Sequence, residues 1–198
     1  MQKTLSWYLT KKEFIINKTQ IRAVGIMFFL TLTVLGAFVY FPLPFTPVPF
    51  TLQTFFVLLC GAFLSKKDGV ATQAVYLGLG VSGIPLFSAL QGGFLKLMGP
   101  TGGYIIGFVF AAYVVSSVID YFRRKNRLEF FPVLFAMSCG MLTIYFFGGL
   151  WLSFFVNFSL SQVFLLGVMP FIPGCIVKTV IAALIYSKAN AQLKGLFR

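Results

Sequence analysis

Residues 22–65 read RAVGIMFFLTLTVLGAFVY-FPLPFTPVP-FTLQTFFVLLCGAFLS, in which two apolar runs flank a proline-rich segment. Each run approaches the roughly 20 residues that an α-helix needs to cross a bilayer. The segment between them holds four prolines in eight residues, from Pro42 to Pro49. Proline removes a backbone donor and clashes with the preceding turn, so this segment is not a helix interior. The stretch predicts a first span over about 22–40, an ordered extended loop, and a second span over about 50–65.

The rest of the chain continues this alternation. A tight polar turn is predicted at Lys66-Lys67-Asp68-Gly69, followed by a third span from about Val70 that is rich in glycine, and by a long loop over 84–102. Further spans are predicted over about 103–118, 131–152 and 162–186, with an uncharged loop at 156–161. Pro170 and Pro173 are expected to break or kink the first half of the last span.

Composition agrees with a membrane protein. Of the 198 residues, 59% are hydrophobic and 10% are charged, whereas soluble domains carry about 25% charged residues. The fold class predicted is therefore an all-α integral membrane protein with six transmembrane helices. Its predicted parts are a cytoplasmic N-terminal tail over 1–21, one membrane domain over 22–190 and a cytoplasmic C-terminal tail over 191–198.

The residue types also limit the chemistry. The chain has no histidine and only four acidic residues, so metal sites and acid–base catalysis lack their usual groups. Its three cysteines are odd in number and fit no disulfide or metal framework. Cys60 and Cys139 are interpreted as small packing residues. We expect no catalytic residues, no metal and no cofactor.

The basic residues predict the orientation. The net charge of +12 could suggest a nucleic-acid partner, but the charges lie in short clusters between apolar runs rather than on one face. The six-span arrangement places one Lys, Lys96, on one side. The other side receives fourteen Lys and Arg residues: Lys3, Lys11, Lys12, Lys18, Arg22, Lys66, Lys67, Arg123, Arg124, Lys125, Arg127, Lys188, Lys194 and Arg198. The positive-inside rule then puts both termini in the cytoplasm and both long loops outside.

Lys178 is the candidate for chemistry within a span. An ionisable residue at that depth is costly, and by default it suggests a functional site. No acidic residue lies in an outer half-span to neutralise it, so an anionic ligand is a natural counter-ion. The alternative is that Lys178 extends its ammonium to an interface, which its position about eight residues from Tyr186 argues against.

The two outer loops are the second candidate. The proline-rich loop could act as a lid over a pocket lined by the glycine-rich loop that ends at Tyr104, because irregular backbone at membrane depth is tolerated where it lines a cavity. The alternative is that both are ordinary connectors. Gly99-Pro100-Thr101-Gly102-Gly103 lacks the Gly-Lys-Ser/Thr ending of a phosphate-binding loop. Gly103 and Gly107 form a small-xxx-small step suited to close helix packing.

Four motifs, taken in order, resemble one known family, the biotin-specific S component (BioY family) of energy-coupling factor transporters. They cover the chain from about residue 20 to 190. They are Pro47-Val48-Pro49-Phe50-Thr51-Leu52-Gln53-Thr54; Tyr76-Leu77-Gly78-Leu79-Gly80 through Gly83-Ile84-Pro85-Leu86-Phe87; Gly99-Pro100-Thr101-Gly102-Gly103-Tyr104 with Gly107-Phe108; and Pro173-Gly174-Cys175-Ile176-Val177-Lys178.

The resemblance implies a plasma-membrane subunit that captures biotin outside the cell. It implies as partners a transmembrane coupling subunit and two cytoplasmic ATPases, with no catalysis by this chain. Lys178 resembles the group that meets the ligand carboxylate. The ligand-binding residues so expected are Lys178, Cys175, Thr51, Gln53, Tyr76, Gln91, Gly102, Gly103 and Tyr104, with Phe45, Thr46, Pro47 and Val48 as the lid.

The chain departs from the family pattern at two places. Cys175 stands where the family usually has aspartate, which removes an acceptor for a ligand N–H and leaves another small anionic vitamin or cofactor as an alternative substrate. The family often has an Ala-x-x-x-Ala step in its first helix for docking on the coupling subunit, and here the corresponding residues are Thr33 and Ala37. A membrane-embedded enzyme and an assembly protein are the rival classes.

Overall fold

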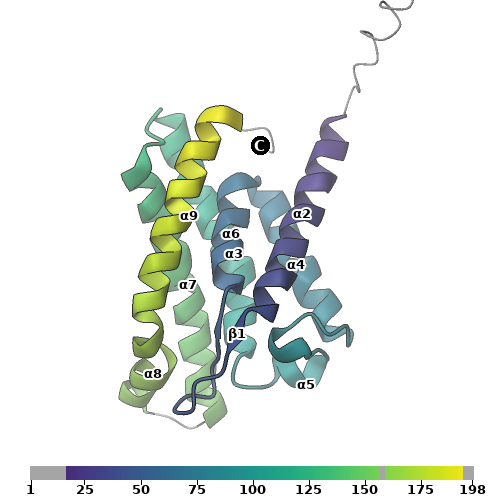
Figure 1. Ribbon diagram of the computed structural model, residues 1–198, viewed down its shortest axis with the longest axis vertical. Helices are drawn as coiled ribbons and strands as arrows, with labels where there is room; N and C mark the ends of the chain where they lie inside the picture. Colours follow the sequence, from purple (N-terminus) through teal and green to yellow (C-terminus); the bar gives the residue numbers. More distant parts are fainter. Residues whose placement is uncertain (1–16, 157–158, 194–198) are drawn as a thin grey trace, which may run out of the picture.

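The computed structural model describes residues 17–156 and 159–193. The protein is a bundle of helices that run alternately up and down (Figure 1). The predicted tails lie mostly outside the described residues, as do positions 157–158 of the predicted loop at 156–161. The elements in order are α2 (Lys18–Phe38), β1 (Tyr40–Phe41), β2 (Phe50–Thr51), α3 (Gln53–Phe63), α4 (Lys66–Val81), η1 (Ser88–Leu90), α5 (Phe94–Leu97), α6 (Gly102–Arg124), α7 (Phe130–Val156), α8 (Leu160–Gly167), η2 (Met169–Phe171) and α9 (Ile172–Leu193).

The first helix begins earlier than the sequence suggested. Asn17 caps it by accepting from Thr19 N, and Gln20 returns a side-chain bond to the Asn17 backbone. This capping box satisfies backbone donors that a helix start otherwise leaves unpaired. Residues 18–21 of the predicted N-terminal tail therefore form the first turn of α2.

The predicted turn at 66–69 is wrong. These residues form the first turn of α4, because Ser65 caps the helix by accepting from Asp68 N at 3.3 Å. The chain instead reverses at Leu64 and Ser65. The Asp68 carboxylate accepts from Ser65 Oγ and pairs with Arg22 of α2 at 2.7 Å. The pair fixes the start of α4 against α2.

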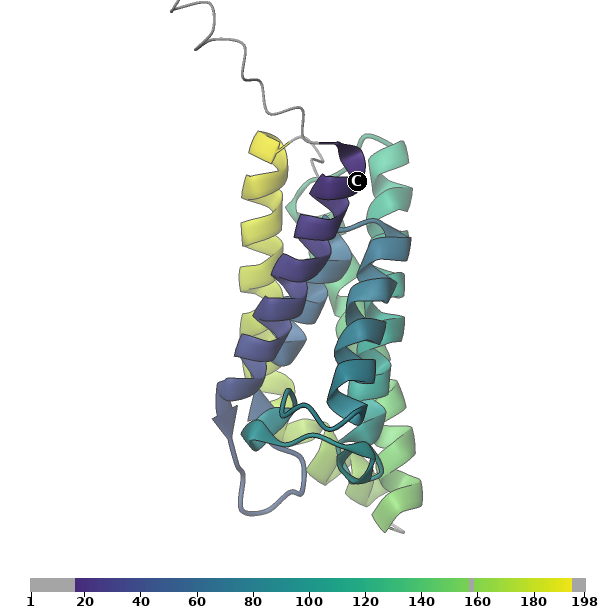
Figure 2. The ribbon, with the colours of Figure 1, turned by 90° about the vertical axis from the view of Figure 1, so that its right-hand side faces the viewer.

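Both predicted outer loops lie at the same end of the bundle (Figures 1 and 2). The proline-rich loop is a short antiparallel hairpin, in which Tyr40 pairs with Thr51 and Phe41 with Phe50. The loop predicted over 84–102 contains η1 and α5. We call this end, formed by residues 40–51 and 82–101, the hairpin end. It is opposite to the end where α2 begins and α9 finishes.

Close helix packing occurs where glycine was expected to allow it. A Cβ on Gly103 would lie 2.1 Å from the Trp151 Cβ, and one on Gly107 would lie 3.2 Å from the Ile144 Cα. The small-xxx-small step of α6 therefore lets α7 approach closely. The last predicted span is broken as expected, because η2, which contains Pro170, separates α8 from α9.

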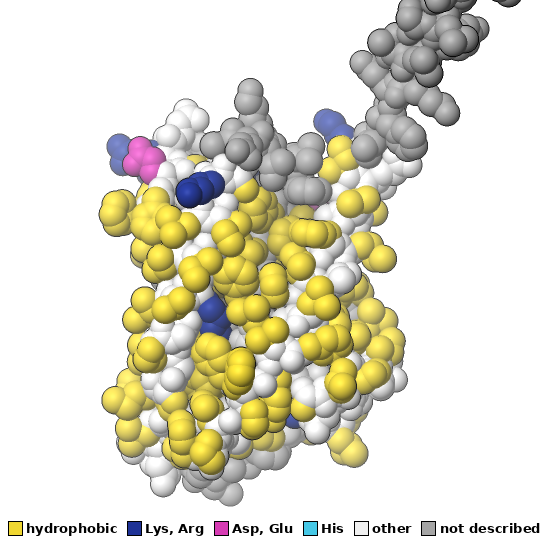
Figure 3. Space-filling model, in the orientation of Figure 1, with side chains coloured by type: hydrophobic (Ala, Val, Ile, Leu, Met, Phe, Trp, Pro, Cys, Tyr) yellow, Lys and Arg dark blue, Asp and Glu magenta, His cyan; other side chains and the backbone are white. Residues whose placement is uncertain are grey.

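The bundle has the surface of a membrane protein. Among the described residues, four segments are long and apolar enough to cross a bilayer: Lys18–Phe38, Gly102–Arg124, Phe130–Phe154 and Ser161–Asn190. The shorter α3 and α4 run alongside them (Figure 2). Hydrophobic side chains are the commonest kind on the visible face, and most visible Lys and Arg side chains gather away from the hairpin end (Figure 3).

The Thr33-x-x-x-Ala37 step of α2 is buried. Thr33 and Ala37 are both fully buried. Thr33 donates to Phe29 O within its own helix and accepts from Gln73 of α4. This face of α2 packs inside the bundle, so the step that departs from the family pattern makes helix contacts within this chain. The exposed face of α2 carries Val24, Met27, Phe28 and Leu35 instead.

Candidate ligand-binding site

Lys178 is turned into the bundle from α9. It is 7% exposed, while its neighbours Ile176 and Val177 lie on the outer face. Its Nζ donates to Thr51 O at 2.9 Å and to Thr54 Oγ1 at 3.1 Å. Both acceptors are uncharged oxygens from β2 and the start of α3, so the ammonium keeps its charge available to an anionic group. The ammonium therefore ends inside the bundle, beside β2 and α3.

The Phe50 ring covers the ammonium. The Lys178 Nζ lies 3.9 Å from the ring centroid, a cation–π distance. The ring fits there because residue 174 is glycine: a Cβ at this position would lie 2.4 Å from the Phe50 ring. Lys178 thus supplies the charge. Gly174, one helical turn earlier, leaves the space for the Phe50 ring that contacts this charge.

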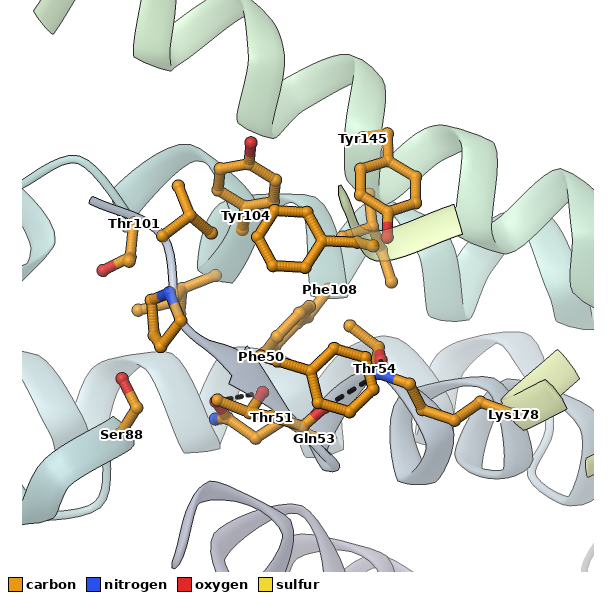
Figure 4. Close-up of a pocket in the computed structure, with 15 residues that line it drawn as sticks. Phe50, Thr51, Gln53, Thr54, Ser88, Thr101, Tyr104, Phe108, Tyr145 and Lys178 are labelled. Atoms are coloured by element: carbon orange, nitrogen blue, oxygen red, sulfur yellow. Dashed lines mark hydrogen bonds between the residues drawn. The ribbon is translucent and has the colours of Figure 1, made fainter. Parts of the chain in front are cut away.

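A cavity extends from Lys178 between the hairpin and helices α6 and α7 (Figure 4). Its walls are mainly aromatic and aliphatic, with a few polar groups, which is the usual character of a small-molecule site. It is lined by Val48, Pro49, Phe50, Thr51, Gln53, Thr54, Ser88, Thr101, Tyr104, Ile105, Phe108, Ile144, Tyr145, Phe171 and Lys178.

A chain of hydrogen bonds holds the wall formed by α3. Thr51 Oγ1 donates to Gln53 Oε1 at 3.2 Å, and Gln53 Nε2 donates to the Tyr76 hydroxyl. That hydroxyl in turn donates to Leu86 O at 3.0 Å. Tyr76 therefore stands behind Gln53, and it fixes the amide while its own side chain stays fully buried.

The opposite wall is anchored by two tyrosines. Tyr104 of α6 donates to Gly167 O at 2.9 Å, which ties it to the end of α8. Tyr145 of α7 is hydrogen-bonded to the Cys175 thiol. Cys175 thus lies on the inward side of α9, but it contacts Tyr145 and is not among the residues that line the cavity.

The structure brings together part of the predicted set. Thr51, Gln53, Tyr104, Lys178 and Val48 line the cavity. Two more stand directly behind it: Tyr76, and Thr46, whose hydroxyl accepts from Val48 N at 3.2 Å.

The remaining predicted residues lie elsewhere. Gly102 and Gly103 pack against Leu97 and Trp151, where a side chain would clash. Gln91 is exposed and pairs through its backbone with Phe87. The lid residues Phe45 and Pro47 are also exposed.

Sequence reasoning missed most of the opposite wall, on which it named only Tyr104. Ile144, Tyr145 and Phe171 come from apolar runs whose inward faces nothing in the pattern distinguishes from lipid-facing ones, and Phe108 lay in the third motif without being singled out. Only Tyr145 carried a signal, because a hydroxyl in the middle of an apolar span needs a partner. Phe50 and Thr54 lay inside a quoted motif but were not singled out, since their role depends on the position of Lys178.

The fold defines a helical membrane protein with a cavity near one end of its bundle. The family model of the BioY family matches residues 10–195. A probable biotin transporter of Pyrococcus horikoshii is 38% identical over 164 residues, 83% of this chain and 93% of that protein. A biotin transporter of Thermotoga maritima is 38% identical over 157 residues, 79% of this chain and 88% of that protein. The chain belongs to the BioY family.

A solved structure supports the fold assignment. The S-component for biotin from an ECF-type ABC transporter matches with a TM-score of 0.82 and 25% sequence identity, and the match covers 89% of this chain and 95% of that chain. The resemblance inferred from the motifs is therefore confirmed, and the chain is a multi-pass membrane protein of a transporter family, not an enzyme.

Proposed function

We propose that this chain is the biotin-binding subunit of a vitamin importer and that biotin binds in the cavity beneath the hairpin. The relatives named above are biotin transporters. The observation that carries the proposal within this chain is the buried ammonium of Lys178, whose hydrogen bonds go to the uncharged oxygens of Thr51 and Thr54. A carboxylate at this point would supply the counter-charge, and charge-assisted bonds are the stronger class of hydrogen bond.

The proposed orientation has six spans with both termini in the cytoplasm. The spans are α2, α3, α4, α6, α7 and the α8–α9 segment. The clustering of Lys and Arg away from the hairpin end supports it, because cytoplasmic ends carry the excess of basic residues. The cavity then opens toward the outside, where a ligand is captured.

The proposed partners are a transmembrane coupling subunit and two cytoplasmic ATPases. An S component of an ECF-type ABC transporter is the structural match, and the sequence of this chain contains no phosphate-binding loop of its own. This chain would contribute ligand capture and the partners would contribute energy. No cofactor is required for that role.

A thermal-shift screen of the purified protein tests the assignment. A ligand that binds the folded state stabilises it by mass action, by about 2.7 kcal/mol at 100 times its Kd. Biotin should raise the melting temperature in a concentration-dependent manner, and other small anionic vitamins should do so less. A larger shift with a different vitamin, and none with biotin, would favour the alternative substrate that Cys175 leaves open.

A further inference from the structure

The end of the cavity opposite Lys178 carries two hydroxyl groups. Figure 4 shows Ser88 and Thr101 at that end, with Phe50, Tyr104 and Phe108 between them and the lysine. Ser88 is 5% and Thr101 is 6% exposed. The cavity therefore has a cationic end, an aromatic middle and a neutral polar end.

The Thr101 hydroxyl is buried without a hydrogen-bond partner among the described residues. Such a group is costly unless something else satisfies it. Threonine at a helix N-cap ordinarily bonds to the first turn, and Thr101 is the N-cap of α6. Its backbone is in the right-handed helical region, at φ −93° and ψ −6°, and its side chain makes no capping bond. The Thr101 hydroxyl therefore makes no hydrogen bond to the first turn of α6.

Two features of the surroundings suit an acceptor on the ligand. Thr101 begins a helix of 23 residues, and the N-terminus of a helix carries partial positive charge. A hydroxyl can donate one hydrogen bond, and it can accept others. Ser88 is held nearby in a tight turn, where Ala89 and Leu90 both have positive φ and Phe87 N donates to Gln91 O at 2.8 Å.

We propose that Thr101, assisted by Ser88, hydrogen-bonds to the neutral polar head of the ligand, while Lys178 binds its carboxylate. For biotin the head is the ureido ring, whose carbonyl oxygen would accept from Thr101 and whose N–H groups could donate to Ser88. The apolar part of the molecule would then lie against the aromatic middle. This inference rests on the proposed function, and it makes Thr101 a determinant of specificity for the head group.

Biotin titrations of the purified full-length chain test the proposal. Thr101→Val replaces the hydroxyl with a methyl group of similar shape and should weaken biotin binding by about 3- to 10-fold, the range of one neutral hydrogen bond. Thr101→Ser keeps the hydroxyl and should stay within about twofold of the wild type. Thr143→Val is the matched control, because the Thr143 hydroxyl bonds to Cys139 O within α7 and does not line the cavity.

A second ligand separates recognition from folding. Lipoate has the same carboxylate chain as biotin but a ring without N–H or carbonyl groups, and its affinity is measured by competition. Thr101→Val should leave lipoate affinity unchanged, whereas Lys178→Met should lower the affinity of both ligands. Equal biotin affinity in Thr101→Val and the wild type would overturn the proposal, as would an equal loss for both ligands. Either of these two results would leave the proposed function intact. If the wild type binds no biotin, both the proposed function and this inference fail.

Discussion

The Lys178 ammonium lies 3.9 Å from the centroid of the Phe50 ring, and this contact joins the last helix to the hairpin. The same strand supplies Thr51 O as a hydrogen-bond acceptor for Lys178. Lys178, which we expect to bind the ligand, therefore also holds in place the hairpin that covers the cavity. An anion that binds Lys178 would act on the position of the hairpin through these two contacts.

Gly174→Ala should weaken biotin binding. The new Cβ would lie 2.4 Å from the Phe50 ring, so the ring must move off Lys178 or into the cavity. Loss of a cation–π contact worth about 0.5–2 kcal/mol corresponds to a loss of about 2- to 30-fold.

Titration calorimetry on matched variants checks this coupling between Gly174 and Phe50. In a Phe50→Leu background, Gly174→Ala should have much less effect, because the clash is relieved. Gly78→Ala is the control, since a Cβ there meets no atom within 4 Å. Additive losses from Phe50→Leu and Gly174→Ala would contradict the packing account.

Asp68→Asn should destabilise the fold without changing biotin affinity. Asp68 is 3% exposed and accepts from Arg22 and Ser65, and it lies far from the hairpin end. Loss of its charge should lower the free energy of unfolding by about 1–3 kcal/mol. Thermal unfolding should show the decrease, and Lys67→Gln, at an exposed neighbour, should not. An Asp68→Asn protein as stable as the wild type would show that the Arg22 pair contributes little.

The membrane orientation can be checked by cysteine labelling of intact cells. Lys67→Cys and Lys125→Cys should react only after the cytoplasmic side is made accessible, and Gln91→Cys should react from outside. All three positions are exposed. The wild type sets the background, because Cys60 and Cys175 are buried and Cys139 is partly buried. Labelling of Lys125→Cys from outside would contradict the six-span orientation.

Much of this architecture could be predicted from the sequence. Apolar runs and basic clusters located the helices, and the prolines between 42 and 49 located the hairpin. The turn at 66–69 was misassigned because the polarity of Lys66 and Lys67 outweighed the capping signal of Ser65 and Asp68. The burial of Thr33 and Ala37 could not be predicted because, in a span that is apolar all round, composition does not say which face is buried.

The site was predicted from its charge rather than its shape. Lys178 stood out because a charge within a span is rare, and its partners Thr51 and Thr54 were in a quoted motif. Gly102 and Gly103 were expected to form a pocket wall, but they instead allow close contact with Leu97 and Trp151. Local sequence cannot distinguish a glycine that lines a cavity from one that admits a neighbouring helix.

Energy coupling gives a cellular prediction. Uptake of biotin against a gradient should require co-expressed coupling and ATPase subunits, while binding to the purified chain should not. The measurement is accumulation of labelled biotin in a host that lacks such subunits, with and without them supplied. Strong uphill uptake by this chain alone would contradict the proposed division of labour.

The most direct test of the account is a double-mutant cycle between Lys178 and the ligand carboxylate. Biotin and its neutral amide are titrated against the wild type and Lys178→Met, with Lys188→Met, an exposed lysine on the same helix, as the control. Lys178→Met should weaken biotin binding by about 10- to 150-fold, as expected for a charge-assisted bond of roughly 1.5–3 kcal/mol. The neutral amide should bind the wild type more weakly than biotin does. Its affinity for Lys178→Met should be little lower than its affinity for the wild type. A coupling energy of about 1.5–3 kcal/mol is predicted, and a coupling energy near zero would contradict the placement of the carboxylate at Lys178.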